Sequence, residues 1–246
     1  MPATPAWPPK SLPRLFVRQA LEDGAAVELD PAQANYLGNV LRMGVGAELL
    51  VFDGWSGEWL ARIGEAAKKR MTLAVERQTR GPEDVPDVWL AFAPVKRSQT
   101  DWLVEKATEL GAARLIPVMT QRTVAERVRL ERLESISIEA AEQCGRTRLP
   151  EIAESVSLKQ LLADRDPART LYFADEGGGE PAADTFRRGP ALILTGPEGG
   201  FTDEERATVR AAANAVAVSL GPRILRAETA ALAALTAYMA LAGDWR

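Results

Sequence analysis

Two similar passages near the C-terminus constrain the fold of this 246-residue chain more than any other feature. Residues 191–201 read ALILTGPEGGF, and residues 215–230 read AVAVSLGPRILRAETA. Each passage begins with a short apolar run, breaks at a Gly-Pro pair and continues into a stretch with helical character. Short β-branched runs that end abruptly at glycine are typical of buried parallel strands. The sequence therefore predicts two strand–loop–helix units, and we expect the strands, 191–195 and 216–220, to lie side by side in one sheet.

The glycines of the two loops fall where a parallel sheet binds its ligands, beyond the carboxyl ends of the strands. These are Gly196, Gly199, Gly200 and Gly221. The first loop lacks the spacing of either nucleotide-binding fingerprint, and Glu198 would repel a phosphate. A backbone cradle for a neutral or cationic ligand fits this loop better. A plain turn is the alternative, because Gly-Pro pairs mark loops in general.

The second loop adds positive charge. Arg223 and Arg226 bracket two apolar residues, and an Ala-rich run over 230–242 is a strong helix former. Two arginines therefore precede a helix N-terminus, which itself favours negative charge. This patch suits a carboxylate or a phosphodiester.

Together, TGPEGGF and LGPRILRAETA resemble the loops of one family, the bacterial 16S ribosomal RNA uridine-N3 methyltransferases, or ribosomal RNA small subunit methyltransferase E. This family belongs to the SPOUT superfamily. The stretches KRSQTDWLVEKATELG and EAAEQCGRTRLPEI extend the resemblance across almost the whole C-terminal half. The resemblance implies S-adenosylmethionine as cofactor, a C-terminal trefoil knot and a homodimer with its active site at the subunit interface. Knots are so rare that sequence physics alone would not propose one.

The chemistry of such a reaction suggests roles for residues of the two loops. Methylation of uracil at N3 requires loss of the N3 proton, which places negative charge on the base and its carbonyl oxygens, and Arg226 is expected to stabilise that charge. Glu198 is the candidate general base. Phosphate binding by Arg226, and capping or ion pairing by Glu198, are the alternatives, and alignment of the reactants alone could supply much of the catalysis. The expected cofactor-binding residues are Leu171, Phe173, Leu194, Thr195, Gly196, Pro197, Glu198, Gly199, Gly200, Ser219, Leu220, Gly221, Ile224, Leu225, Arg226, Thr229 and Ala230.

Charge and composition exclude several classes of function. A net charge of −4 argues against a protein that coats nucleic acid nonspecifically, so an RNA substrate requires a local basic surface. The chain has no histidine and one cysteine, which argues against a metal site, a disulfide framework and His-dependent catalysis. No apolar run approaches a membrane span and no signal peptide is evident, which predicts a cytoplasmic location. The expected RNA-binding residues are Arg14, Arg42, Lys96 and Arg146, each of which could instead be ordinary surface charge.

The sequence predicts two domains. Residues 34–63 alternate apolar runs with Gly-rich turns, which is typical of hairpins and predicts a small β-barrel. The stretch VLRM within them resembles the family's N-terminal PUA-like domain. Residues 77–87 have no apolar periodicity and read as a linker. We therefore expect a PUA-like RNA-binding β-barrel over 1–81 and a SPOUT methyltransferase domain over 82–246.

From residue 88 onward strands alternate with helices, which predicts an α/β domain with a mainly parallel sheet. The last helix places Leu232, Leu235, Tyr238 and Met239 on one apolar face. This face favours a homodimer, and packing on the chain's own sheet is the alternative. The predicted elements are strand 12–17, helix 32–40, strand 89–96, helix 101–110, strand 113–120, helix 130–144, helix 158–163, strand 170–176, strand 191–195, strand 216–220 and helix 230–242.

Three functions fit the sequence. The first is an S-adenosylmethionine-dependent methyltransferase that acts on N3 of a uridine in 16S ribosomal RNA, within or apart from the small ribosomal subunit. The second keeps the fold and chemistry but acts on a different RNA, since nothing in these residues reads a nucleotide sequence. The third is a noncatalytic RNA-binding ribosome-assembly factor that keeps the fold as a scaffold.

Overall fold

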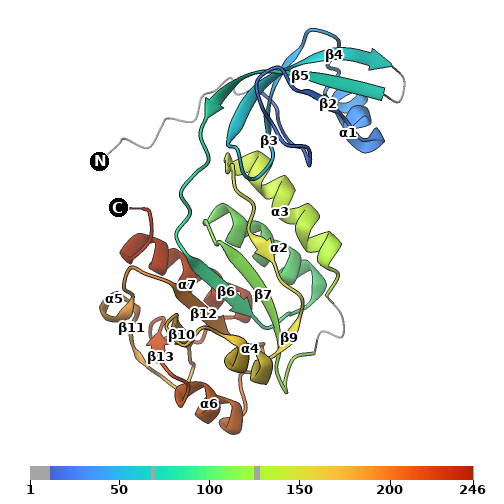
Figure 1. Cartoon of the computed structure of the whole chain (residues 1–246). Helices are drawn as coiled ribbons and strands as arrows, with labels where there is room; N and C mark the ends of the chain where they lie inside the picture. Colours follow the sequence, from blue (N-terminus) through green and yellow to red (C-terminus); the bar gives the residue numbers. More distant parts are fainter. Residues whose placement is uncertain (1–11, 68–69, 125–127, 246) are drawn as a thin grey trace. The chain divides into compact units, whose positions relative to one another are not determined.

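The computed structural model describes residues 12–67, 70–124 and 128–245, which group into two units (Figure 1). Unit 1 contains the chain up to Asp84 together with residues 141–148, and unit 2 contains the rest. The sequence division at 81/82 did not anticipate the return of residues 141–148 to unit 1. This return arises because Arg14 and Arg80 donate hydrogen bonds to backbone carbonyls of that segment.

Unit 1 is a five-stranded sheet in the order β1-β3-β4-β5-β2, with β1 parallel to β3 and the other pairs antiparallel. The described pairings end at β1 and β2, so among the described residues no hydrogen-bonded pair closes the expected barrel. A short helix and a π-helical turn lie between β2 and β3. The elements are β1 (Arg14–Phe16), β2 (Ala26–Glu28), α1 (Pro31–Asn35), η1 (Tyr36–Val40), β3 (Glu48–Phe52), β4 (Glu58–Ala67) and β5 (Arg70–Arg80).

Local signals in the sequence explain where α1 begins. Asp30 caps it by accepting hydrogen bonds from the backbone of Ala32 and Gln33, and the Gln33 side chain accepts one from the Asp30 backbone. Pro31 occupies the first helical position, where its missing N–H costs nothing. The predicted helix over 32–40 corresponds to α1 followed by η1. Leu37 is buried and anchors the turn to the sheet.

Unit 2 contains an eight-stranded sheet in which all the described pairs are parallel. The order is β11-β13-β10-β12-β6-β7-β8, with β9 paired to the end of β7. The prediction of a mainly parallel α/β domain is therefore confirmed. The elements are β6 (Val88–Phe92), α2 (Arg97–Glu109), β7 (Arg114–Met119), α3 (Leu130–Cys144), β8 (Glu151–Ile152), β9 (Val156–Ser157), α4 (Leu158–Asp164), β10 (Thr170–Ala174), β11 (Glu180–Pro181), α5 (Ala182–Thr185), β12 (Ala191–Thr195), α6 (Asp203–Arg210), β13 (Ala215–Ser219) and α7 (Ala227–Leu241).

Helices cover both faces of this sheet (Figure 1). Alternate residues of each central strand point to opposite faces. In β10, Tyr172 packs with α2 and α7 on one face, whereas Leu171 and Phe173 pack with α4 and α6 on the other. Both faces of the central strands are therefore buried, as the uninterrupted apolar runs in the sequence indicate.

The expectation that strands 191–195 and 216–220 are neighbours is wrong. β12 and β13 both pair with β10, which lies between them. Each repeated passage has the expected local structure, but periodicity within a segment says nothing about which strand inserts beside it. The chain leaves β10, forms β12 on one side of it and then β13 on the other. The trefoil knot itself stays a prediction.

The apolar face of α7 packs on its own sheet. Leu235, Tyr238 and Met239 are at most 1% exposed and belong to the core of unit 2. The Tyr238 hydroxyl donates a hydrogen bond to the Gly189 carbonyl at 2.7 Å, and its ring contacts Phe186 edge to face. The sequence argument for a homodimer from this face therefore fails, because the core already uses it.

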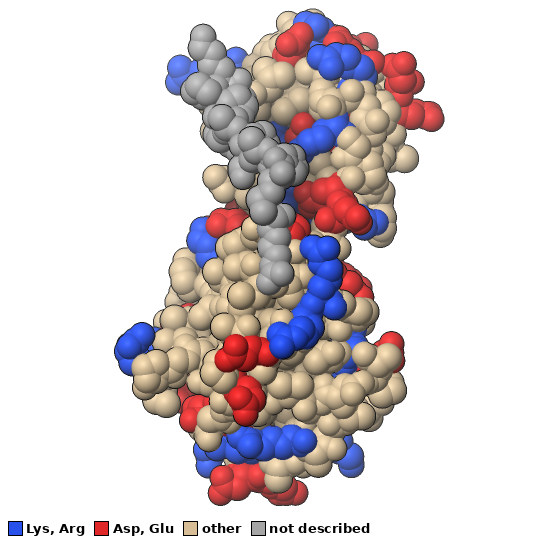
Figure 2. All heavy atoms as spheres, turned by 90° about the vertical axis from the view of Figure 1, so that its left-hand side faces the viewer, with Lys and Arg blue, Asp and Glu red and all other residues tan. Residues whose placement is uncertain are grey.

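Charge is mixed on the surface. On the face that Figure 2 presents, Lys and Arg side chains lie in small groups beside Asp and Glu, separated by uncharged surface. A single broad basic patch is not visible there, in keeping with the net charge of −4. None of the described helices is long and apolar enough to cross a membrane.

Candidate functional site

The carboxyl ends of β10, β12 and β13 meet at one edge of the sheet and open into a cavity of about 510 Å³. Its size lies within the range of small-molecule sites, about 300–1,000 Å³. Three segments form its wall: residues 174–178 after β10, residues 195–200 after β12, and residues 218–227 from the end of β13 into α7. Ala230 of α7 completes the wall. We call this space the cofactor cavity.

Glycine is required in the loop after β12 because other groups approach its backbone closely. A Cβ on Gly196 would lie 2.6 Å from the ring of Phe201, which is buried below the loop. Gly200 has a φ of +67°, and a Cβ there would lie 2.5 Å from a carboxylate oxygen of Glu176. The Gly200 N–H donates to the Pro197 carbonyl at 2.9 Å, which closes the turn. At these two glycines the loop therefore exposes backbone groups to the cavity.

The loop after β10 is held by ion pairs. The Asp175 side chain is fully buried and lies 2.7 Å from Arg210 of α6, and its backbone N–H donates to the Val218 carbonyl. Its Oδ1 accepts a hydrogen bond from the Gly177 N–H. The neighbouring Glu176 contacts Arg206 at 2.6 Å. These ion pairs fix the buried carboxylate of Asp175 and the partly exposed carboxylate of Glu176 at the cavity wall.

A capping box directs the chain from the first loop into α6. The Thr202 side chain accepts from the Glu205 backbone, and the Glu205 side chain accepts from the Thr202 backbone. Glu205 also accepts a hydrogen bond from the Gln121 backbone at 2.8 Å, although it is 84 residues distant in sequence. Arg122 donates to the carbonyls of Gly199 and Phe201. The segment after β7 therefore supports the cofactor loop from outside.

Arg226 stands at the start of α7 and lines the cofactor cavity. Its backbone is extended, with φ −64° and ψ 155°, and its side chain is exposed. Within the described part of the chain no carboxylate forms an ion pair with its guanidinium. An unpaired guanidinium at a helix N-terminus creates local positive potential inside the cavity. Glu198 is exposed on the opposite loop and lines the same cavity.

Thirteen of the residues expected to bind the cofactor do line this cavity: Thr195, Gly196, Pro197, Glu198, Gly199, Gly200, Ser219, Leu220, Gly221, Ile224, Leu225, Arg226 and Ala230. Four do not. Leu171, Phe173 and Leu194 point into the core beneath α4 and α6 and have no exposed surface. Thr229 is exposed on α7 and does not contribute to the cavity wall.

Eight other residues of the cavity wall were not predicted from the sequence. They are Ala174, Asp175, Glu176, Gly178, Val218, Pro222, Arg223 and Ala227. The strand-end rule could have found the first four, because ligands bind beyond the end of a strand and not along its buried length. The resemblance identified strand 170–176 correctly, but the residues chosen from it point into the core.

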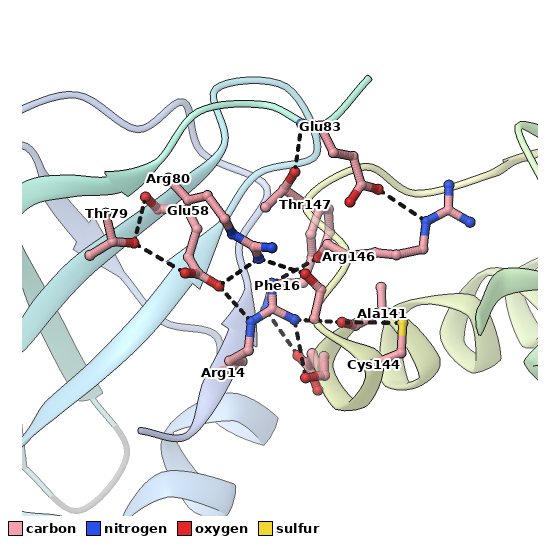
Figure 3. Close-up of polar contacts among 12 residues, drawn as sticks. Arg14, Phe16, Glu58, Thr79, Arg80, Glu83, Ala141, Cys144, Arg146 and Thr147 are labelled. Carbon is pink, nitrogen blue, oxygen red and sulfur yellow. Dashed lines mark hydrogen bonds and ion pairs between the residues drawn. The ribbon is translucent and has the colours of Figure 1, made fainter. Parts of the chain in front are cut away.

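Two of the expected RNA-binding arginines are buried in unit 1 (Figure 3). The Arg14 side chain is 5% exposed, contacts Glu58 at 2.8 Å and donates to the carbonyls of Ala141 and Arg146. It also lies over the Phe52 ring at 4.7 Å. The Arg146 side chain is 7% exposed and contacts Glu83 at 3.2 Å.

These contacts correct the expectation that both arginines bind RNA phosphate, because the guanidiniums are already occupied and shielded from solvent. Arg14 instead satisfies carbonyls at the C-terminal end of α3, where cations are favoured. Sequence alone could not separate a structural arginine from a surface one. Arg42 and Lys96 are exposed, as a phosphate contact requires.

No group of three or more His, Cys, Asp and Glu residues in the described part of the chain is arranged to hold a metal ion. The cavity does fit S-adenosylmethionine, which combines a sulfonium cation, a carboxylate and a neutral nucleoside. Carboxylates of Glu176 and Glu198 tolerate its positive charge, and backbone edges at Gly196 and Gly200 leave room for close approach.

Comparison with known proteins gives consistent matches. Residues 82–239 match the family model of an RNA methyltransferase domain, and residues 29–76 match that of an RNA methyltransferase PUA domain. The chain is similar to ribosomal RNA small subunit methyltransferase E of Rickettsia conorii, with 30% identity over 90% of this chain and 93% of the relative. It is also similar to the protein of the same name from Synechocystis, with 36% identity over 88% of this chain and 74% of the relative.

Solved structures agree with these matches. A ribosomal RNA small subunit methyltransferase E from Neisseria gonorrhoeae, bound to S-adenosyl methionine, superposes with a TM-score of 0.86 at 29% identity, covering 96% of this chain and all of the other. A putative methyltransferase from Legionella pneumophila, in complex with the same cofactor, superposes with a TM-score of 0.87 at 29% identity, covering 94% of this chain and 98% of the other.

Proposed function

The chain belongs to the ribosomal RNA small subunit methyltransferase E family of RNA methyltransferases, and we propose that it methylates N3 of a uridine in 16S ribosomal RNA. S-adenosylmethionine is the cofactor, and when bound it supplies a methyl group on a positively charged sulfur. The observation that carries the proposal is the cofactor cavity at the carboxyl ends of β10, β12 and β13, with Arg226 at its edge.

The chemistry of uracil defines what the residues must do. N3 carries a proton that has to leave before or during attack, and the electron pair left on N3 forms the new bond to the methyl carbon. The negative charge spreads over the two carbonyl oxygens that flank N3. An exposed guanidinium such as that of Arg226 stabilises this charge as it develops. Of the carboxylates on the described cavity wall, Asp175 and Glu176 are paired with arginines, so Glu198 is the proposed proton acceptor.

Alignment supplies the rest of the catalysis. The first loop is fixed by its tight turn, by the capping box of α6 and by Arg122, so the groups that contact the cofactor need little reorganisation. The ion pair between the buried Asp175 carboxylate and the partly exposed Arg210 holds the second wall in the same way. The fold therefore preorganises two of the three segments before any ligand enters.

A deletion strain provides the direct test. Mass spectrometric mapping of its 16S ribosomal RNA should show one uridine that lacks a methyl group, and the wild-type gene should restore it. A complete methylation pattern in the deletion strain contradicts the proposal. If another RNA loses a methyl group, the enzyme keeps its chemistry but acts on that RNA. Calorimetry with S-adenosylmethionine separates both outcomes from a noncatalytic assembly factor, which would not bind the cofactor.

The assembly state and location belong to the same proposal. Relatedness to SPOUT enzymes favours a homodimer, although the buried face of α7 does not supply the evidence expected from sequence. Light scattering at micromolar concentration tests it. A cytoplasmic location follows from a ribosomal substrate.

A further inference from the structure

Unit 2 contains a second cavity, of about 670 Å³, beside the cofactor cavity. Glu198 and Gly199 line both cavities, so the loop after β12 is a wall that the two share. The rest of its described lining comes from residues 94–101, at the end of β6 and the start of α2, and from residues 122–124 and 128–133, which lie between β7 and α3 and in the first turn of α3. A ligand in this cavity lies one loop away from the cofactor.

Basic side chains dominate the second cavity. The charged residues among its described lining are Lys96, Arg97, Arg122, Arg129 and Arg132 against Asp101 and Glu198. Arg132 is neutralised by Asp101 at 2.6 Å. We define Lys96, Arg97 and Arg129 as the basic rim, and all three are exposed. The chain is acidic as a whole, so this concentration of positive charge is a local exception that suits an anion.

The start of α2 reverses the usual charge preference of a helix. Lys96 stands at its N-cap and Arg97 in its first turn, no side chain caps it, and no acidic residue lies in its first turn. By contrast, α6 of the same unit has a capping box and three acidic residues in its first turn. A helix N-terminus favours negative charge, so two cations there raise the free energy of the protein unless an anion lies between them. This arrangement indicates a role in binding rather than in stability.

The floor of the second cavity is apolar. Val95 and Leu133 are buried and Val128 is partly buried, and we define these three as the apolar floor. The Thr100 hydroxyl accepts from the Val95 N–H and donates to the Val95 carbonyl, both at 3.1 Å. This pair of bonds fixes the turn between β6 and α2. The cavity lining thus combines buried apolar side chains with exposed cations.

We propose that the second cavity binds one nucleotide of the RNA substrate, with a phosphate group at the basic rim and the base on the apolar floor. A nucleotide is the ligand that combines a flat, largely apolar body with a phosphate anion, and it matches both surfaces. The shared wall places that nucleotide beside the methyl donor. The inference rests on the proposed function and names where its substrate enters.

Arg122 links the two cavities. Its guanidinium lines the second cavity while it donates to the carbonyls of Gly199 at 2.9 Å and Phe201 at 3.3 Å in the cofactor loop. A nucleotide that displaces or tightens Arg122 changes the support of that loop. Arg122 is therefore a positioning residue. Bound RNA should change the affinity for the cofactor by the same factor by which bound cofactor changes the affinity for RNA.

Binding measurements test the nucleotide site without relying on turnover. Small ribosomal subunits from the deletion strain are titrated with wild type, Lys96→Ala/Arg129→Ala and Lys159→Ala over a range of salt concentrations. Lys159 is an exposed lysine on α4 that lines neither cavity, and it serves as the control. The double variant should bind about tenfold more weakly or worse, and the salt slope of log affinity should fall in magnitude by about 0.7–0.9, the value for the one phosphate that the rim holds. Its affinity for S-adenosylmethionine, measured by calorimetry in the absence of RNA, should stay within about twofold of wild type.

A cross-linking experiment locates the nucleotide. Ribosomal RNA that contains 4-thiouridine, irradiated with the wild-type protein, should yield cross-links to residues within 94–101, 122–124 or 128–133. Wild-type affinity and slope in the double variant, or cross-links that map only elsewhere, would overturn the nucleotide site. Failure of the proposed function looks different, because wild type would then bind subunits but transfer no methyl group to them. Failure of wild type to bind subunits at all overturns both.

Discussion

Gly200 is the residue of the cofactor loop whose backbone conformation and surroundings most restrict substitution. Its φ of +67° opposes a side chain, and so does the Glu176 oxygen that would lie 2.5 Å from a Cβ. In Gly200→Ala the Glu176 side chain can move aside, but the positive φ still costs about 1–3 kcal/mol, which the loop relieves by leaving the conformation that lines the cavity. Calorimetry should therefore show S-adenosylmethionine binding about tenfold more weakly or worse. Gly44→Ala is the control, because Gly44 has open space around it and no positive φ. Equal affinity in a folded Gly200→Ala protein would contradict this account of the loop.

Arg226 should affect turnover more than binding. Its proposed partner is charge that appears on uracil only during methyl transfer, so Arg226→Ala should lower kcat by about 100-fold or more and leave the KM for RNA nearly unchanged. Single-turnover methyl transfer to small subunits measures this. Arg223→Ala, three residues earlier on the same exposed loop, is the matched comparison and should lose much less. A normal kcat for Arg226→Ala at saturating substrate would remove its catalytic role but leave the cofactor cavity intact.

At the scale of elements, Tyr238 ties α7 to the sheet. Burial raises the pKa of its phenol to about 12 from an ordinary value of 10.0. The folded state therefore holds the phenol proton more tightly than the unfolded chain, so this contribution is complete below about pH 10 and is lost as the pH rises from about 10 to 12. Urea unfolding of wild type and Tyr238→Phe across this range should show the difference in unfolding free energy shifting against wild type by about 2 kcal/mol. A difference that is independent of pH would mean that Tyr238 is not buried in solution as it is here.

Most single elements could be predicted because their signals are local. The helix over 130–144 and the strand over 191–195 have the bounds expected from periodicity and flanking glycines. Helix α2 begins at Arg97, whereas the sequence indicated a start at Asp101. The start of α2 was misplaced because no side chain caps it. The same uncapped helix start contributes Lys96 and Arg97 to the second cavity. The neighbours of β10 and the inward direction of Phe173 depend on contacts far apart in sequence, so local patterns could not give them.

At the scale of the whole molecule, the segment 141–148 depends on Arg14. Arg14 and Glu58 are 5% and 10% exposed, so Arg14→Ala leaves a carboxylate largely buried with Arg80 as its remaining ion-pair partner. It also leaves the carbonyls of Ala141 and Arg146 without this donor. We expect a loss of about 3 kcal/mol in stability, seen as a lower thermal midpoint. Arg62→Ala removes two exposed ion pairs of the same unit and should cost less than about 1 kcal/mol. Equal midpoints for the two variants would show that the buried cluster is not a structural tie.

Domain boundaries and RNA contacts were only partly predictable for a related reason. The division near residue 82 follows from composition. The sequence does not distinguish an arginine that binds a phosphate from one that donates hydrogen bonds to carbonyls at the end of a helix. The structure separates the two cases by burial. Arg14 and Arg146 are enclosed, whereas Arg42 stands on an exposed turn after η1.

Arg42 is therefore the residue of unit 1 from which RNA affinity is best tested, because an acidic chain must bind a polyanion through few cations. Its φ of +57° is rare for a residue other than glycine, and the turn is closed by a hydrogen bond from the Met43 N–H to the Leu37 carbonyl at 2.9 Å. Exposed Tyr36, Val40 and Leu41 precede it and offer surface for unstacked bases.

We expect Arg42→Ala to weaken binding of small subunits and to lower the magnitude of the salt slope by about 0.7–0.9, the value for one phosphate contact. Arg70→Ala is the control, since Arg70 is also exposed on unit 1 but pairs with Glu28 at 3.1 Å. Catalysis on a saturating substrate should be unchanged in Arg42→Ala, because none of the described residues of unit 1 lines the cofactor cavity. An unaltered affinity and slope in Arg42→Ala would reject this turn as a substrate contact and leave the basic rim of unit 2 as the main source of RNA affinity.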